Sequence, residues 1–244
     1  MNANVHGWID PADGSSNLGR FLSLLDAQKP DVACVEEVYG KRFDALKRIA
    51  MAGYNFIFAP TKYSPGKGPY GNLVVSRYQI SLDSVMALPA LDSDLKYEPR
   101  NAIKATLHNE NRVNNMKIIA SHVSHIAAEN QLQLNALDYL TDAEAVTTPL
   151  ALCADTNALA STMRSSNLGS FFGYSSLGNT PWTFGEHRTD YIVNINPTID
   201  CDNGVPDPVQ YTEDFGSDHR ALFSGFNISD CREALVMATT VRRS

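Results

Sequence analysis

Short apolar runs alternate along the chain with segments of helical periodicity. Between residues 15 and 28, apolar side chains recur at the spacing of one helix face: Leu18, Phe21, Leu22 and Leu25. Pro30 follows, where a helix cannot continue, and the apolar run over 31–38 then predicts a buried strand. The same alternation of helix and strand continues to residue 226.

The pattern as a whole predicts the elements of an α/β protein. Strands are expected at 1–5, 31–38, 54–59, 72–76, 81–87, 102–108, 113–121, 150–154, 189–194 and 220–226. Helices are expected at 15–28, 41–52, 127–145 and 158–167. Exposed loops are expected at 61–71, which is rich in Gly and Pro, at 170–188 and at 197–216. Helices that cover strands on two faces predict a four-layer αββα sandwich of two packed mixed β-sheets flanked by helices.

Composition and charge narrow the class of protein. The 244 residues are 43% apolar and 19% charged, which excludes a disordered or collagen-like chain. The net charge of −7 argues against binding nucleic acid through overall charge, but leaves room for a local basic groove. We expect one domain over 1–244, with a first strand shortened at its start and a tail over 232–244.

Location and assembly are expected from the same features. No apolar run approaches the roughly 20 residues of a membrane span, so none is predicted. The expected compartment is the cytoplasm, or a secreted or periplasmic location if a leader is missing, and the expected state is a monomer.

The four cysteines give no CxxC pair, which argues against a thiolate zinc site. Cys34 and Cys153 lie in apolar runs and are expected in the core. Cys201 and Cys231 lie in polar segments, where either free thiols or a disulfide is compatible with the sequence.

Polar residues that carry chemistry stand at the ends of the predicted strands. They are Asn4, His6, Glu36, Glu37, His122, His125, Asp155, Asn157, Asp190, Asp218 and His219. If the strands lie side by side, these groups converge on one edge of the sandwich. Converging carboxylates repel one another unless a cation lies among them, and oxygen ligands without thiolate favour Mg²⁺ or Mn²⁺. Such an ion, with imidazole and amide donors, suits the cleavage of phosphoesters.

Seven short motifs carry a resemblance to a known family. In chain order they are Asn4–Gly7, Asp31–Val38, Tyr70–Arg77, Ser121–Val123, Ala154–Asn157, Arg188–Ile192 and Ser217–Arg220. The chain resembles the endonuclease/exonuclease/phosphatase superfamily, the metal-dependent group that includes pancreatic deoxyribonuclease. Each motif alone is weak, whereas seven in family order over nearly the whole chain are a strong signal.

The resemblance implies a catalytic set: His219, Asp155, Asp190, His122 and Asn157. Asp155 would position the nucleophile or bind metal, and Asn157 would hold a phosphate oxygen. His219 would act as general base or phosphate-binding cation, oriented by Asp190. His122 matches a second active-site histidine.

The resemblance also implies a metal, Mg²⁺ or Mn²⁺, on Glu37, with help from Asp218 and Asn4. His6 and Glu36 are expected behind the residues that touch metal or substrate. Glu36 falls where the family often has Gln. His6 and His122 differ from the exonuclease III branch, which has Asp and Tyr there, and so favour the deoxyribonuclease, phosphodiesterase and sphingomyelinase branches.

Contacts with phosphate or the rest of the substrate are expected from five residues: Asn157, Arg100, Tyr70, Asn72 and Trp182. A surface position for Arg100, and ordinary packing for the aromatic residues, remain equally compatible with the sequence.

The expected function is that of a metal-dependent phosphodiesterase or nuclease, in which metal and histidine activate water to cleave a phosphodiester of nucleic acid or a nucleotide. A phosphomonoesterase and a lipid phosphodiesterase of the sphingomyelinase type are alternatives within the enzyme class. An inactive binding domain of the same fold, and a secreted nuclease with a Cys201–Cys231 disulfide, also stay open.

Overall fold

The structure is a computed structural model. It describes residues 1–91, 98–108, 115–142, 149–166, 168, 189–194, 210–211 and 215–224. Trp182, Cys201, Cys231 and the expected tail over 232–244 lie outside the described residues.

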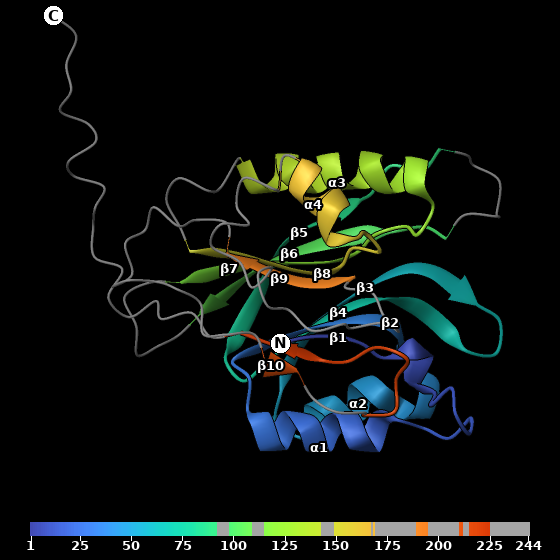
Figure 1. Ribbon diagram of the computed structural model, residues 1–244. Helices are drawn as coiled ribbons and strands as arrows, with labels where there is room; N and C mark the ends of the chain where they lie inside the picture. The colour runs from blue at the N-terminus through green and yellow to red at the C-terminus, as the bar shows by residue number, and fades with distance from the viewer. Residues whose placement is uncertain are drawn as a thin grey trace, which may run out of the picture.

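Two mixed β-sheets pack face to face (Figure 1). The first has the order β10 (Gln210–Tyr211), β11 (Leu222–Phe223), β1 (Asn2–Asn4), β2 (Val32–Tyr39), β4 (Gly68–Ser76) and β3 (Asn55–Ser64). The second has the order β5 (Gln79–Ala87), β6 (Asn101–His108), β7 (Met116–His122), β8 (Leu150–Asp155) and β9 (Asp190–Asn194).

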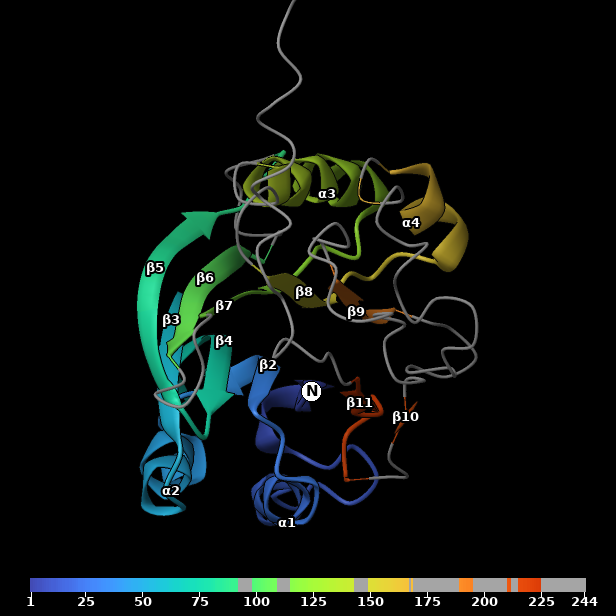
Figure 2. The same ribbon diagram turned by 90° about the vertical axis from the view of Figure 1, so that its left-hand side faces the viewer.

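Helices cover the outer faces of both sheets. In Figure 1, α1 (Leu18–Gln28) and α2 (Ala45–Met51) lie beneath the first sheet, and α3 (Ala127–Asp142) and α4 (Ala160–Ser165) lie above the second. Figure 2 shows the same four layers after a quarter turn. The expected αββα sandwich is therefore confirmed.

The interior between the sheets is apolar. Cys34 and Val74 of the first sheet meet Ile103, Ile118 and Cys153 of the second in one buried cluster. Cys34 and Cys153 are buried free thiols, as the sequence predicts. Each of the two outer faces has a further cluster against its helices, so every sheet face that packs on another layer buries apolar side chains.

The expected loop over 61–71 is wrong. The segment forms the top of the β3–β4 hairpin, in which Ser64 pairs with Gly68. Gly66 and Gly68 make the turn, with φ of 76° and 84° in the left-handed region that glycine adopts without strain. Gly71 faces the β3 backbone so closely that a Cβ would lie 2.1 Å from the Ala59 oxygen. The Gly and Pro content thus serves a tight hairpin.

Two other boundaries differ from expectation. The helix expected over 41–52 begins as a 3-10 turn, η2 (Arg42–Asp44), and becomes α-helical only at Ala45. The segment 197–216, expected as a loop, contains the short strand β10 (Gln210–Tyr211). In the part of the chain that the structure describes, no helix is long and apolar enough to cross a membrane.

Candidate active site

Strand pairing brings the chemical groups to one end of the sandwich. In the first sheet, parallel pairing of β1 with β2 sets Asn4 beside Glu36. In the second, His122 at the end of β7 pairs with Asp155 at the end of β8, and Asp155 pairs with Asp190 at the start of β9. Residues far apart in sequence thereby come into contact, as the hydrogen bond from Asn2 to Asp190, 188 positions apart, illustrates.

Asn4 joins the two sheets at this end. Its side-chain Nδ2 donates to Glu37 Oε1 at 3.2 Å and to Asp155 Oδ2 at 3.0 Å. Its Oδ1 accepts from the His6 backbone at 3.0 Å, in the 3-10 turn η1 (His6–Trp8). The two carboxylates therefore face a common donor across the gap between the sheets.

A β-bulge in β2 separates the two glutamates. Val35 pairs with Leu73 and Val38 with Gly71, so two residues of β2 oppose one of β4. Glu37 takes the left-handed region, at φ 58°, a strained conformation typical of functional positions. The bulge lets Glu37 reach Asn4 while Glu36 is buried.

Glu36 is an isolated buried carboxylate. It is 1% exposed, and neither oxygen has a hydrogen-bond partner among the described residues. Burial raises its pKa well above the usual range, and the charges of Asp190 and Asp155 raise it further. Glu36 is thus buried near Asp155 and Asp190, and its place behind the residues that touch metal or substrate stays a prediction.

Asp190 holds His219 from behind. His219 Nδ1 lies 2.8 Å from Asp190 Oδ2, and His219 Nε2 lies 3.7 Å from Asp155 Oδ2. Asn2 and Thr189 each donate a hydrogen bond to Asp190, which fixes the carboxylate in turn. The imidazole is thus oriented with one nitrogen on Asp190 and the other facing Asp155.

The charges of this trio shift the pKa of two members. Burial alone would lower the pKa of His219, but the charge and hydrogen bond of Asp190, followed by Asp155, raise it to about 10. Burial, and then the charge of Asp190, raise the pKa of Asp155 to about 7. At neutral pH the imidazole is a cation, and Asp155 titrates between acid and base.

The same three residues can hold a metal ion. One ligand atom each from Asp155, Asp190 and His219 lies within 4.8 Å of the others, and all three residues are buried. Asp218, which the sequence also places at the metal, has its Oδ2 3.1 Å from His6 Nδ1. Carboxylate and imidazole donors without thiolate fit a divalent ion of the Mg²⁺ or Mn²⁺ type.

His122 lies on the other side of Asp155, with its Nε2 3.5 Å from Asp155 Oδ2. Arg100 Nη1 lies 2.7 Å from His122 Nδ1, and because a guanidinium can only donate, Nδ1 must accept and Nε2 must carry the proton. Burial, followed by the Arg100 charge, lowers the pKa of His122 well below its usual value. His122 is therefore a neutral donor.

Glu98 holds Arg100 in place, a contact that no motif in the sequence indicates. Glu98 Oε2 lies 3.0 Å from Arg100 Nη2, and Lys62 of β3 pairs with the other Glu98 oxygen. The only signal in the sequence was a carboxylate two positions before the arginine at the start of a strand.

Asn157 completes the group around Asp155. Its backbone N–H donates to Asp155 Oδ1 at 3.0 Å, and its φ of 48° lies in the left-handed region. Its Nδ2 lies 3.1 Å from His122 Nε2 and donates to the Val123 oxygen at 2.9 Å. Asp155 is thus the centre on which Asn4, Asn157, His122 and His219 converge.

Two residues that the sequence expects to contact substrate are buried and packed against neighbouring residues. Tyr70 is 5% exposed and packs on Tyr39 with ring centroids 4.9 Å apart. Asn72 is buried and donates to the backbone and side-chain oxygens of Asn101 at 3.0 and 2.9 Å. Both side chains use their polar or aromatic surface on neighbouring residues, which the sequence could not indicate.

The fold is shared with several solved structures. The human Nocturnin catalytic domain with bound sulfate is 19% identical, with 86% of each chain covered and a TM-score of 0.61. D. rerio TDP2 complexed with single strand DNA product is 17% identical, with 93% and 97% covered and a TM-score of 0.65. Bacteroides thetaiotaomicron mannosyl-6-phosphatase is 15% identical, with 92% and 98% covered and a TM-score of 0.68.

Comparison with curated proteins by sequence gives no match. The model of one family, described as Endonuclease/Exonuclease/phosphatase family, matches residues 3–219. That span contains every residue around Asp155 described above. The chain therefore belongs to the endonuclease/exonuclease/phosphatase family, whose members are hydrolases that act on phosphoester bonds.

Proposed function

We propose that the chain is a divalent-metal-dependent phosphodiesterase that cleaves a phosphodiester of nucleic acid or of a nucleotide. The observation that carries the proposal is that two histidine rings converge on Asp155. One is the imidazolium of His219, held by Asp190 at 2.8 Å, and the other is the neutral imidazole of His122, held by Arg100 at 2.7 Å.

Glu37 and Asp155 would hold the ion, since Asn4 already brings these two carboxylates to one point. The His219–Asp190 hydrogen bond engages the other two candidate ligands with each other. When bound, a Mg²⁺ or Mn²⁺ ion would polarise a phosphoryl oxygen and offset the charge of the carboxylates.

Asp155 and His219 have complementary roles. Asp155, which the Asn4 side chain and the Asn157 backbone hold in place, is suited to orient the attacking water by accepting its hydrogen bond on a carboxylate oxygen. His219, with a pKa of about 10, is suited to donate its Nε2 proton in a hydrogen bond to a phosphoryl oxygen. Asp190 keeps this nitrogen directed toward the reaction by binding the other one.

His122 and Asn157 are suited to stabilise the remaining oxygens of the transition state. The Nε2–H of His122 and the Nδ2 of Asn157 lie 3.1 Å apart on the same side of Asp155. Both are donors, so an oxyanion placed between them would satisfy both. Donors directed at developing charge are worth about 10²- to 10³-fold in rate each.

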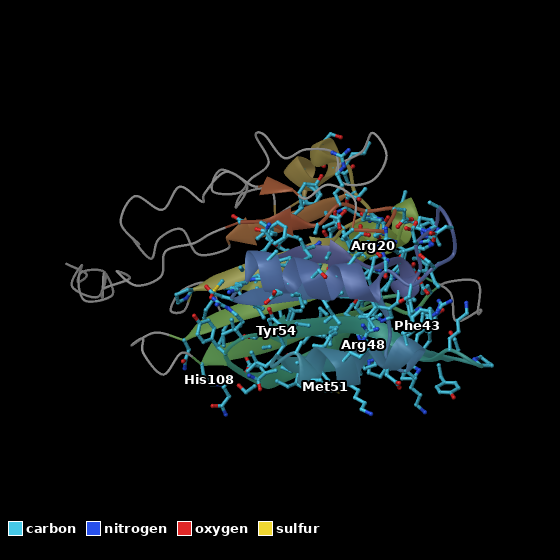
Figure 3. The ribbon with its side chains drawn as sticks, turned by 90° about the horizontal axis from the view of Figure 1, so that it is seen from below. Arg20, Phe43, Arg48, Met51, Tyr54 and His108 are labelled. Carbon is cyan, nitrogen blue, oxygen red and sulfur yellow. The ribbon has the colours of Figure 1, made fainter. Side chains whose placement is uncertain are left out.

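The test is hydrolysis of a panel of phosphoesters in Mg²⁺ and in Mn²⁺: bis-p-nitrophenyl phosphate, p-nitrophenyl phosphate, single-stranded DNA, duplex DNA, RNA and sphingomyelin. We expect diester cleavage that EDTA abolishes, and a loss of about 10²-fold or more in kcat for Asp155→Asn and for His219→Ala. His108→Ala, at the opposite end of the sandwich from Phe43 (Figure 3), is the matched control and should retain activity.

The panel also separates the alternatives. Preference for the monoester would establish a phosphomonoesterase, and preference for sphingomyelin a lipid phosphodiesterase. Full activity in both variants would refute the roles given to Asp155 and His219. Absence of all hydrolysis, with no binding of Mn²⁺ by calorimetry, would leave an inactive binding domain.

A further inference from the structure

A group of cations lies against aromatic rings beside Glu37. The Arg42 guanidinium is 5.8 Å from the centre of the Tyr39 ring, and Lys67 Nζ is 5.4 Å from the same centre. Lys62 Nζ is 4.6 Å from the centre of the Tyr70 ring, which packs on Tyr39. We call these five residues the cation–aromatic surface. Cations over ring faces are held by the ring quadrupole, which limits where they can move.

Backbone contacts hold this surface together. Gly40, directly after β2, donates its N–H to the Pro69 oxygen in the β3–β4 hairpin at 2.9 Å. Gly68 leaves room for the Lys41 side chain, because a Cβ there would lie 3.0 Å from Lys41 Cβ. In Figure 3, Phe43 marks the end of the molecule where η2 follows β2. The surface therefore spans the end of β2, the η2 turn that follows it, and the β3–β4 hairpin.

The surface is continuous with the site around Asp155. Burial raises the pKa of Tyr70 above its usual value, and the nearby charges of Glu37 and Glu98 add to this effect. Glu98 pairs with Lys62 of the surface and with Arg100 of the site. A ligand that extends from the reacting phosphate toward the hairpin would reach this surface first.

The charge of the surface is opposite to that of the chain. The whole sequence carries −7, whereas the surface contributes three cations. Among the described residues, Glu98 is paired with Lys62, while neither Arg42 nor Lys67 has a carboxylate within ion-pair distance. Like charges that gather without counter-charges repel one another, so the arrangement fits an anionic ligand that offsets them.

We propose that the cation–aromatic surface binds phosphates of a polynucleotide strand that flank the phosphodiester being cleaved. The inference rests on the proposed function and adds to it that the substrate is a polymer. Lysine and arginine contacts with the sugar-phosphate backbone position a strand without selecting its sequence. A mononucleotide or a lipid headgroup carries its phosphate only at the reacting centre. Such a ligand would leave the cations of the cation–aromatic surface without a phosphate to bind.

The first test is binding without cleavage. Fluorescence anisotropy in EDTA would measure the Kd of labelled single-stranded DNA, duplex DNA and RNA of 12 nucleotides, for the unmodified protein, Lys67→Glu, Lys67→Gln and the control Lys29→Glu. Lys29 is exposed and precedes β2 at the end away from Glu37, so it reports the effect of net charge alone. We expect a rise in Kd of about tenfold for Lys67→Glu and a smaller rise for Lys67→Gln.

Salt dependence gives a second readout. For Lys67→Gln, the slope of log Kd against log salt concentration should fall by about one, the value for one lost phosphate contact. The comparison of the three polymers identifies the kind of strand. The proposal would be overturned if Lys67→Glu and Lys29→Glu had the same Kd for all three polymers. It would also be overturned if a mononucleotide bound with a Kd as low as that of a 12-mer.

Kinetics distinguish this failure from failure of the proposed function. In Mg²⁺, Lys67→Glu should lower kcat/KM for the bound polymer at least about fivefold more than for bis-p-nitrophenyl phosphate, which has no flanking phosphates. Equal losses would contradict the surface while leaving a phosphodiesterase. No hydrolysis of any ester would refute the proposed function, and the anisotropy result would still decide whether the surface binds strands.

Discussion

Asp155 is the residue on which the site depends most. It is 1% exposed, yet it lies near another buried carboxylate, Asp190, and near Glu36. Burial of charge is costly unless hydrogen bonds and opposite charges compensate, and here Asn4, the Asn157 backbone and His219 supply them. The carboxylate is thereby kept poised to gain or lose a proton near neutral pH.

The stability of the metal-free protein should fall as pH rises. The pKa of Asp155 is 3.8 in the unfolded chain and about 7 in the folded protein. Its contribution to the free energy of unfolding is therefore fully present below pH 3.8 and is lost as the pH rises through 7. His219 has an unfolded value of 6.5 and a folded pKa of about 10, so its contribution is present below 6.5 and is lost through 10.

Thermal unfolding of the metal-free protein at pH 5, 7 and 9 measures this effect. From pH 5 to pH 7, the Tm of the unmodified protein should fall at least about 2 °C more than the Tm of Asp155→Asn, because the variant lacks the titrating carboxyl group. Parallel Tm curves for the two proteins would show that Asp155 does not titrate in this range.

Arg100 should fix the tautomer of His122. Because its guanidinium donates to Nδ1 at 2.7 Å, we expect ¹⁵N spectra of ring-labelled histidine to show His122 protonated on Nε2. Arg100→Gln should give a mixture of tautomers and lower kcat on the order of tenfold, and Arg100→Lys should restore part of both. An unchanged spectrum in Arg100→Gln would mean that the orientation of His122 has another origin.

The sequence indicates which residues are candidates for the site, but it does not indicate which of them contact one another. Glu37, Asp155, Asp190 and His219 could be named as candidates because seven motifs, each after a predicted strand, occur in family order. Contacts that depend on tertiary register, such as Glu98 with Arg100, leave no periodic signal. The contact of Asp218 with His6, 3.1 Å between Oδ2 and Nδ1, left no such signal either, and the expected metal role of Asp218 stays a prediction.

At the scale of elements, the β2 bulge and the β3–β4 hairpin shape one side of the site. The bulge places Glu37, and the hairpin pairs with β2 through Tyr39 and Tyr70. Apolar runs predicted the strands well because buried β-strands alternate or repeat apolar side chains over short lengths. The hairpin top escaped prediction because its Gly and Pro residues are also typical of loops.

Gly71 should be essential to this hairpin. An added Cβ would lie 2.1 Å from the Ala59 oxygen and 2.7 Å from Pro60 Cα, so Gly71→Ala must separate β3 from β4. We expect a loss of about 1–3 kcal/mol in the free energy of unfolding, measured by urea denaturation. Gly19→Ala in α1 is the control, since a Cβ there meets nothing within 4 Å and should be neutral or stabilising. Equal stability of the two variants would contradict this account.

At the scale of the whole molecule, the site exists only where the two sheets meet. Asn4 and Glu37 come from the first sheet, and His122, Asp155 and Asp190 from the second. A metal ion bound between the sheets should therefore stabilise the fold as well as the site.

Mn²⁺ at about 100 times its Kd should raise Tm by about 5 °C or more, since such binding is worth about 2.7 kcal/mol. Glu37→Gln should remove most of the rise in a thermal scan. Asp218→Asn should retain more of it, because Asp218 lies against His6. If Asp218→Asn lost more of the rise in Tm than Glu37→Gln, Asp218 and not Glu37 would be the metal ligand.

The junction between the sheets also has a temporal consequence. Asn4 is made early on the ribosome, whereas His219 is made 215 positions later and reaches its place through the return of β11 to β1, where Leu222 pairs with Asn2. A nascent chain that ends before residue 219 already contains Asn4, Glu37, His122 and Asp155 but lacks His219. The group of side chains around Asp155 is therefore complete only after β11 has joined β1.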